Sequence, residues 1–155
     1  MENFLKFRIG KYEFFVPLKN VVRVLPAAAL KEYPVSEGSL LLGYIILEGE
    51  PVAVFDIYQR VGLTFPGMDI SHKMILMKRN GFRFLLVVDE VADVLELDPA
   101  QFNNFAMNTY TSGSVLIDSS GRFIINDLGT FIKEDVLLDL TTGEKILAGD
   151  THEQS

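Results

Sequence analysis

The 155-residue chain has no cysteine, no tryptophan and only two histidines. Without cysteine it can form neither a disulfide nor a thiolate metal site, and this absence is weakly consistent with the cytoplasm. It also has no uninterrupted apolar run of the length that spans a bilayer. The first residues, MENFLKFRIG, carry an acid at position two and alternate polar with apolar, unlike a signal peptide. We therefore expect a soluble, cytoplasmic protein without direct membrane insertion.

Positive charge is scarce as well. Fourteen Lys and Arg against 21 Asp and Glu give a formal net charge of -7. Nucleic-acid binding needs clustered cations, and the strongest local basic run is Lys78-Arg79. Neither of the glycine patterns that cradle phosphates is present. We expect no nucleic-acid partner and no cofactor.

The apolar content is what the sequence does have, and it favours strands. Hydrophobic residues make up 48% of the chain and include twelve Phe. The pairs Gly10-Lys11, Glu48-Gly49 and Asn80-Gly81 each separate two apolar runs, as in tight hairpins. Residues 18 to 25 fit either a short helix or a strand. Short strands, tight turns and few helices predict a mainly β protein built of antiparallel barrels.

The stretch from Gly43 to Leu63 predicts a strand, a turn, a strand and a short helix capped by Asp56. Residues 113 to 128 resemble residues 43 to 57 in plan, with a Gly, an apolar strand, a Gly-containing turn, a second apolar strand and then an Asp. Asp127 stands 71 residues after Asp56. This similarity fits two related β lobes. The connector TFPGMDIS, residues 64 to 71, is rich in turn formers and marks the best boundary between them.

Candidates for catalysis are few. Asp69, Ser71 and His72 superficially offer an acid, a nucleophile and a base. Members of a triad converge from separate elements, however, so adjacent residues favour a plain loop. Asp69 and His72 also lack a third metal ligand at a recognisable spacing. We expect no catalytic residue and no metal ligand.

Three segments resemble the CheW family of chemotaxis adaptors, in order and with matching spacing: FLKFRIGKYEFFVPLKNVVRV, GYIILEGEPVAVFDIYQRVGL and FLLVVDEVADVLEL. The resemblance implies two small five-stranded β-barrel lobes packed side by side, with short helices. A single CheW-like domain would cover residues 1–138, with lobe one at about 1–66, lobe two at about 67–138 and a polar tail at 139–155. It further implies a non-catalytic coupler between the regulatory domain of a CheA-type histidine kinase and the cytoplasmic tip of chemoreceptors.

The resemblance also implies a partner-binding set. Its expected members are Arg23, Gly43, Tyr44, Glu48, Gly49, Val88, Asp89 and Val91. Two of them depart from the family, which usually has Glu at the position of Arg23 and Arg at the position of Glu48. Ile46 stands where the family has Asn. Because the first two departures are complementary in charge, we predict an ion pair between Arg23 and Glu48 with reversed polarity.

Two other functions remain open at this stage. One is an adaptor of a non-standard chemosensory or surface-motility pathway with a different partner, which the departures at Arg23 and Glu48 would favour. The other is a small ligand-binding or hydrolytic β barrel that uses Asp69, Ser71 and His72. The ligand-binding or hydrolytic function predicts a concave pocket around His72.

Overall fold

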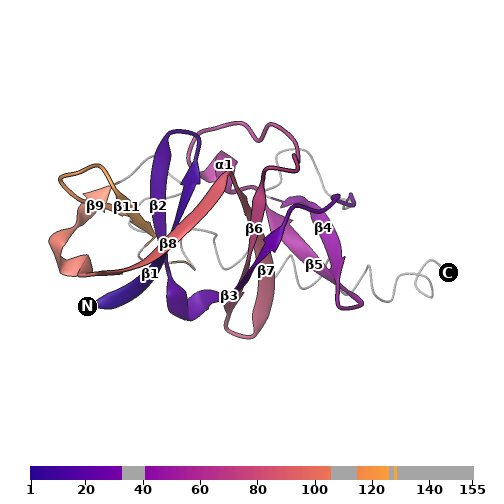
Figure 1. Ribbon diagram of the computed structural model, residues 1–155, viewed down its shortest axis with the longest axis horizontal. Coiled ribbons are helices and arrows are strands. Elements are labelled where there is room, and N and C mark those ends of the chain that lie inside the picture. Colours follow the sequence, from indigo (N-terminus) through magenta and orange to yellow (C-terminus); the bar gives the residue numbers. More distant parts are fainter. Residues whose placement is uncertain (33–40, 106–114, 126–127, 129–155) are drawn as a thin grey trace.

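The computed structural model describes residues 1–32, 41–105, 115–125 and 128, and these residues form a mainly β protein with two sheets (Figure 1). The six-stranded sheet has the order β8 (Glu90–Leu97), β1 (Glu2–Ile9), β2 (Tyr12–Pro17), β11 (Phe123–Ile125), β10 (Val115–Ile117) and β9 (Asn103–Phe105). The five-stranded sheet has the order β3 (Val21–Pro26), β6 (Lys73–Arg79), β7 (Phe82–Val88), β5 (Glu50–Phe55) and β4 (Leu41–Leu47). The helical turns in the described residues are η1 (Leu18–Asn20), α1 (Ile57–Arg60) and η2 (Pro99–Gln101).

Each sheet contains a hairpin from the other half of the chain. The β1–β2 hairpin begins the chain, yet it lies in the same sheet as β8 to β11. The β6–β7 hairpin begins the second half, yet it lies beside β3, β4 and β5. The expected lobes at about 1–66 and 67–138 therefore do not coincide with the sheets, because each sheet takes strands from both halves. The boundary at 138 and the tail at 139–155 lie outside the described residues.

The two halves pair their strands in the same way. β3 lies antiparallel to β6, and β8 lies antiparallel to β1. β5 runs parallel to β7, and β11 runs parallel to β2. The similarity predicted between residues 43–57 and 113–128 is thus confirmed in strand pairing, while Asp127 lies outside the described residues. The short strand β9 follows η2.

The expectation of closed barrels is wrong for the described ladders, which form open sheets. Closure requires a ladder between the two edge strands of a sheet. At the edges of the five-stranded sheet, an isolated bridge joins Lys31 to Tyr44 instead, after β3 has ended at Pro26. The six-stranded sheet also exceeds the expected five strands, because β9 adds to its edge.

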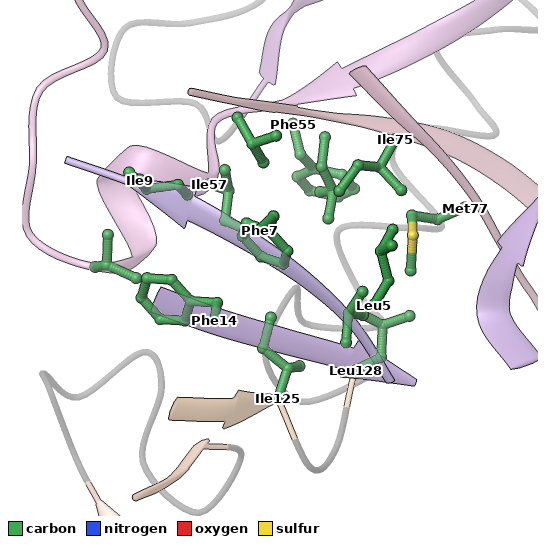
Figure 2. Packing of buried hydrophobic residues seen from close by; sticks show 14 of the residues in the cluster. Leu5, Phe7, Ile9, Phe14, Phe55, Ile57, Ile75, Met77, Ile125 and Leu128 are labelled. Atoms are coloured by element: carbon green, nitrogen blue, oxygen red, sulfur yellow. The ribbon is translucent and has the colours of Figure 1, made fainter. Parts of the chain in front are cut away.

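Apolar side chains fill three layers. The central cluster joins the two sheets, and Figure 2 shows Phe7 between Phe14 of its own sheet and the residues Phe55, Ile75 and Met77 of the other. A second cluster lies on the other face of the five-stranded sheet, and a third on the other face of the six-stranded sheet. Both faces of the central strands are therefore buried, which explains their continuous apolar runs.

The strand β7 shows this alternation residue by residue. Phe84, Leu86 and Val88 point into the central cluster, whereas Leu85 and Val87 point into the second cluster. All five are fully buried. Because side chains of a strand alternate between its faces, a register slip of one residue would move every one of them to the wrong layer.

The predicted turns are confirmed. Asn80 and Gly81 have φ of 52° and 85°, and Glu48 and Gly49 have φ of 55° and 83°, as a type I′ turn requires. The carboxylate of Asp56 accepts a hydrogen bond from the backbone N–H of Gln59 at 3.1 Å and caps α1. The ambiguity over residues 18 to 25 resolves into η1 followed by β3.

Gly43 permits a close approach between two backbones. It has φ of 151° at an irregularity of β4, and a Cβ at this position would lie 2.2 Å from the carbonyl oxygen of Lys31. Glycine alone has no side chain to clash there. The two hydrogen bonds between Lys31 and Tyr44, at 2.8 and 2.9 Å, depend on this approach.

We predict that Gly43→Ala lowers the free energy of unfolding by about 2–4 kcal/mol, because it combines backbone strain with a backbone clash. Gly49→Ala is the matched control, since Gly49 also has positive φ but no neighbour within 4 Å of a built Cβ. The control should lose only about 1–2 kcal/mol from strain. Urea unfolding of both variants measures the difference, and equal losses would contradict the proposed clash.

Candidate functional site

The predicted ion pair between Arg23 and Glu48 is present. The Nη2 atom of Arg23, on β3, lies 3.6 Å from Oε1 of Glu48, in the turn between β4 and β5. Arg83 of β7 reaches the same oxygen at 3.3 Å and also approaches Glu50 at 3.9 Å. The side chains of Arg23 and Glu48 are 47% and 64% exposed, so they belong to the surface.

Exposed apolar side chains accompany this ion pair. Val22 and Val24 flank Arg23 on β3 and are 49% and 41% exposed. Ile46 lies near the end of β4, two residues before Glu48, and is 50% exposed. We call these five residues the β3–β4 patch. Protein interfaces combine an apolar core with a polar rim, so exposed apolar side chains near charged ones suit an interface. Because side chains alternate along a strand, Val24 points to the opposite face from Arg23, and the patch extends around the edge strand β3.

The other expected site residues have different positions. Gly43 and Tyr44 form the close approach to Lys31, and Gly49 completes the turn after Glu48. Val88 is fully buried in the central cluster, and Val91 packs against the same cluster. The structure therefore brings Arg23 and Glu48 together at the surface, while these five residues shape the backbone and the core.

Asp89 stands where the chain passes from β7 in one sheet to β8 in the other. Its Oδ2 atom accepts a hydrogen bond from the backbone N–H of Gly10 at 2.6 Å. Its Oδ1 atom accepts from the hydroxyl of Tyr58 and lies 3.4 Å from Nε2 of His72. Arg8 lies 3.6 Å away. We call these five residues the Asp89 cluster, and they join both sheets, α1 and the connector.

The contacts of this cluster shift two pKa values. Burial would raise the pKa of Asp89, but the hydrogen bonds from Tyr58 and Gly10 and the charge of Arg8 outweigh it, so the pKa lies below 3.8. Burial, followed by the hydrogen bond to Asp89, raises the pKa of Tyr58. With 22% of its side chain exposed, Asp89 makes several contacts within the fold.

The geometry around His72 opposes the hydrolase hypothesis. The hydroxyl of Ser71 donates to the carboxylate of Asp69 and not to the imidazole. The Nδ1 atom of His72 accepts the backbone N–H of Asp69 at 2.9 Å, and its Nε2 atom faces Asp89. Neither nitrogen is therefore placed to take a proton from Ser71, which a serine nucleophile requires. His72 is 5% exposed, so its ring packs in the interior of the protein.

Sequence reasoning missed Arg83 and Tyr58. Arg83 reaches Glu48 because β7 lies parallel and next to β5, a long-range pairing that no local pattern reveals. Tyr58 could have been noticed as the aromatic residue of the short helix that follows Asp56, since a buried Tyr hydroxyl usually has a partner.

The described residues contain neither a candidate metal site nor a helix that could span a membrane. Within the described ranges, no group of three His, Cys, Asp or Glu side chains is placed to hold a metal ion. Among the helices of these same ranges, none has the length and apolar character needed to cross a membrane.

Comparisons with known proteins agree with the fold. The family model of the CheW-like domain matches residues 3–134. Among solved structures, the chain is similar to the scaffolding protein TtCheW from Thermoanaerobacter tengcongensis, with a TM-score of 0.65 and 20% sequence identity. The match covers 80% of this chain and 86% of that one, and it shows a shared fold. A comparison with curated proteins finds no match.

We predict that Asp89→Asn lowers the free energy of unfolding at pH 7 by about 1–3 kcal/mol, because it removes a charged acceptor from a partly buried cluster. The folded-state pKa lies below 3.8, so the carboxylate stabilises the fold above that pH and loses this effect as the pH falls below it. The difference between wild type and variant should therefore shrink in acid.

The control is Asp93→Asn, which removes a carboxylate from an exposed position of β8. It should change stability by less than about 0.5 kcal/mol at any pH. Thermal unfolding from pH 7 to pH 3 compares the three proteins. A constant difference between wild type and Asp89→Asn across this range would show that the charge of Asp89 does not stabilise the fold.

Proposed function

Because the chain belongs to the CheW-like domain family, we propose that it is a non-catalytic adaptor that joins a CheA-type histidine kinase to the cytoplasmic tip of chemoreceptors. Its proposed location is the cytoplasm, where both of these partners are reached. Such an adaptor works by surface complementarity, and the β3–β4 patch is the surface that supports this role best.

The observation that best supports the proposal is the backbone conformation of Glu48. This residue has φ of 55°, a conformation that glycine, asparagine and aspartate adopt far more readily than glutamate. The turn between β6 and β7 has the same geometry and uses Asn80-Gly81, the favoured pair. Glu48 is thus unfavourable for its turn, although it is 64% exposed and no packing requires it. A strained residue on a surface is a reason to propose binding.

The neighbouring charges determine what Glu48 presents to a partner. Arg23 and Arg83 both contact its Oε1 atom, so the carboxylate is held in one position between two cations. Exposed ion pairs contribute only about 0–1 kcal/mol each to stability, and their main effect is on recognition. A partner must carry charges that complement Arg23, Glu48 and Arg83, and apolar side chains that fit those of the β3–β4 patch.

A second candidate follows from the same residues. Arg23, Ile46 and Glu48 all differ from what the CheW family usually has at these positions. Since like charges facing each other repel, a partner made for the usual charges would bind poorly here. These differences favour an adaptor of a non-standard chemosensory or surface-motility pathway, with a kinase or receptor that carries compensating changes.

We predict that Glu48→Asn weakens partner binding at least fivefold and keeps or raises the free energy of unfolding, by up to about 1 kcal/mol. Asparagine suits the turn, which offsets the loss of the two exposed ion pairs. Urea unfolding measures stability. Isothermal titration with the CheA-type kinase regulatory domains and receptor tips encoded in the same genome measures binding.

The mirrored control is Asn80→Glu, which places glutamate in the other type I′ turn. It should lower the free energy of unfolding by about 1 kcal/mol and leave binding unchanged. The role of Glu48 is contradicted if Glu48→Asn binds as tightly as wild type. Binding of the wild-type chain to none of the kinases and receptor tips would count against both candidate functions.

Glu48→Arg separates the two candidates. In the ordinary coupling role, arginine at this position restores the usual family charge and should preserve or tighten binding to kinases and receptors of standard pathways. In the non-standard role, it should abolish binding to the native partner, because that partner is matched to the negative charge of Glu48 and would meet a positive one. The same titrations compare the two outcomes.

A further inference from the structure

The outer edge of β4 has an unpaired backbone position at Ile46. β4 is an edge strand of the five-stranded sheet, so one of its sides pairs with β5 and the other faces outward (Figure 1). On the outer side, Tyr44 exchanges two backbone hydrogen bonds with Lys31, at 2.8 and 2.9 Å. Backbone groups alternate between the two sides of a strand, so those of Ile46, two residues further on, face outward as well. Among the described residues they have no hydrogen-bond partner.

The residue opposite Ile46 supports this orientation. Ile46 pairs with Pro51 of β5. Because proline has no N–H, it cannot exchange two hydrogen bonds with Ile46, so the backbone groups of this pair point away from each other. The side chain of Ile46 is 50% exposed. The edge therefore offers a donor, an acceptor and an apolar side chain at one position.

The second half of the chain covers the corresponding edge with a strand of its own. Ile117 of β10 stands 71 residues after Ile46, the same interval as between the two aspartates of the repeated plan. In β9, Asn103 pairs with Ile117, and Phe105 pairs with Val115. β9 has only three residues, so a short extended segment is enough to cover this edge.

The first half of the chain begins the same cover but does not continue it. An isolated bridge joins Lys31 to Tyr44, as the last residue of β9 pairs with the first residue of β10. In the same register, Ala29 would lie opposite Ile46. No ladder of the described strands includes Ala29, however, and this residue is exposed. The edge of β4 is thus left open where the edge of β10 is covered.

We infer that an extended segment of a protein partner pairs with β4 at this edge, antiparallel to it, in the place that β9 takes beside β10. A backbone N–H of the segment donates to the carbonyl of Ile46, and a backbone carbonyl of the segment accepts from the N–H of Ile46. Directly opposite residues have their side chains on the same face of a sheet, so an apolar side chain of the segment packs against that of Ile46. Main-chain hydrogen bonds supply the affinity when a strand is added to a sheet.

Net charge does not select this segment. Beside the edge, Arg23 and Arg83 contact Glu48, and Arg83 also approaches Glu50, so two cations and two acids balance. The edge instead requires an extended backbone and an apolar residue opposite Ile46. Ile46 belongs to the β3–β4 patch, so the inference rests on the proposed function and adds how a partner is bound at that same surface.

A second copy of the chain fits this edge less well. Two β4 strands paired about Ile46 would bring Glu48 of each copy opposite Tyr44 of the other. The outward backbone groups of Tyr44 are already bonded to Lys31, so this pairing would have to displace the bridge. A segment of a different protein avoids the conflict, because it can extend from Ile46 toward the turn at Glu48.

Amide hydrogen exchange, followed by NMR, tests strand addition directly. The full chain is measured alone and with the CheA-type kinase regulatory domain or the receptor-tip fragment that it binds. The N–H of Ile46 should exchange rapidly in the free chain and at least tenfold more slowly in the complex. The N–H of Tyr44 is the internal control, since its bond to Lys31 should keep its exchange slow in both states.

Two variants separate the backbone of Ile46 from its side chain. Ile46→Pro removes the outward N–H, which the fold does not use, and proline is tolerated on edge strands. It should weaken binding by about 10- to 100-fold. Ile46→Ala keeps the N–H and should weaken binding by only about two- to fivefold. Equal losses in the two variants would show that the side chain alone makes the contact, which would overturn the inference.

Three further outcomes are decisive against strand addition by a partner. If a partner binds and the exchange of Ile46 stays within twofold of that in the free chain, the inference is refuted while the proposed function stands. If the wild-type chain binds no kinase domain and no receptor tip, the proposed function fails and the inference fails with it. If the exchange of Ile46 slows as the concentration of the chain alone rises, the edge pairs with a second copy and not with a partner.

Discussion

The burial of both faces of the central strands is the constraint on which the rest of the structure depends. β7 sends alternate residues into two different apolar clusters, and β2 does the same with Phe14 and Phe15. These strands belong to hairpins that the two halves of the chain have exchanged. Neither half can complete its sheet alone, so the sheets are expected to fold together as one unit. A rigid body of this kind can hold a binding surface in a fixed geometry.

The crossing from one sheet to the other explains the role of Asp89. Val88 ends β7 in the five-stranded sheet, and Glu90 begins β8 in the six-stranded sheet. Asp89 lies between them and accepts hydrogen bonds from Gly10, in the turn between β1 and β2, and from Tyr58 of α1. A carboxylate can accept several hydrogen bonds at once, which suits a position where separate elements converge. Asp89 thus helps to hold the two sheets together.

Local features could be predicted from the sequence, because short-range chemistry determines them. The hairpin turn at Asn80-Gly81 and the cap at Asp56 were both confirmed. The pair of Arg23 with Glu48 joins separate strands and was confirmed as well, but it was predicted from complementary departures from the family pattern and not from local chemistry. The exchange of hairpins and the open sheets could not be predicted, since strand pairing depends on packing between distant segments. The contact of Arg83 with Glu48 follows from that pairing and was missed for the same reason.

The corresponding turns of the two halves use their acidic side chains differently. In the turn between β10 and β11, Asp118 is 9% exposed and forms a 2.6 Å ion pair with Arg122. That arginine also lies over the ring of Phe15, so the charges are used within the fold. In the turn between β4 and β5, Glu48 is 64% exposed and contacts arginines of other strands. Asp118, in the turn between β10 and β11, is therefore buried against its partner, whereas Glu48, in the turn between β4 and β5, is exposed to solvent. The two pairs of strands are otherwise arranged in the same way. Because the shared fold does not require this difference, it is best explained by recognition.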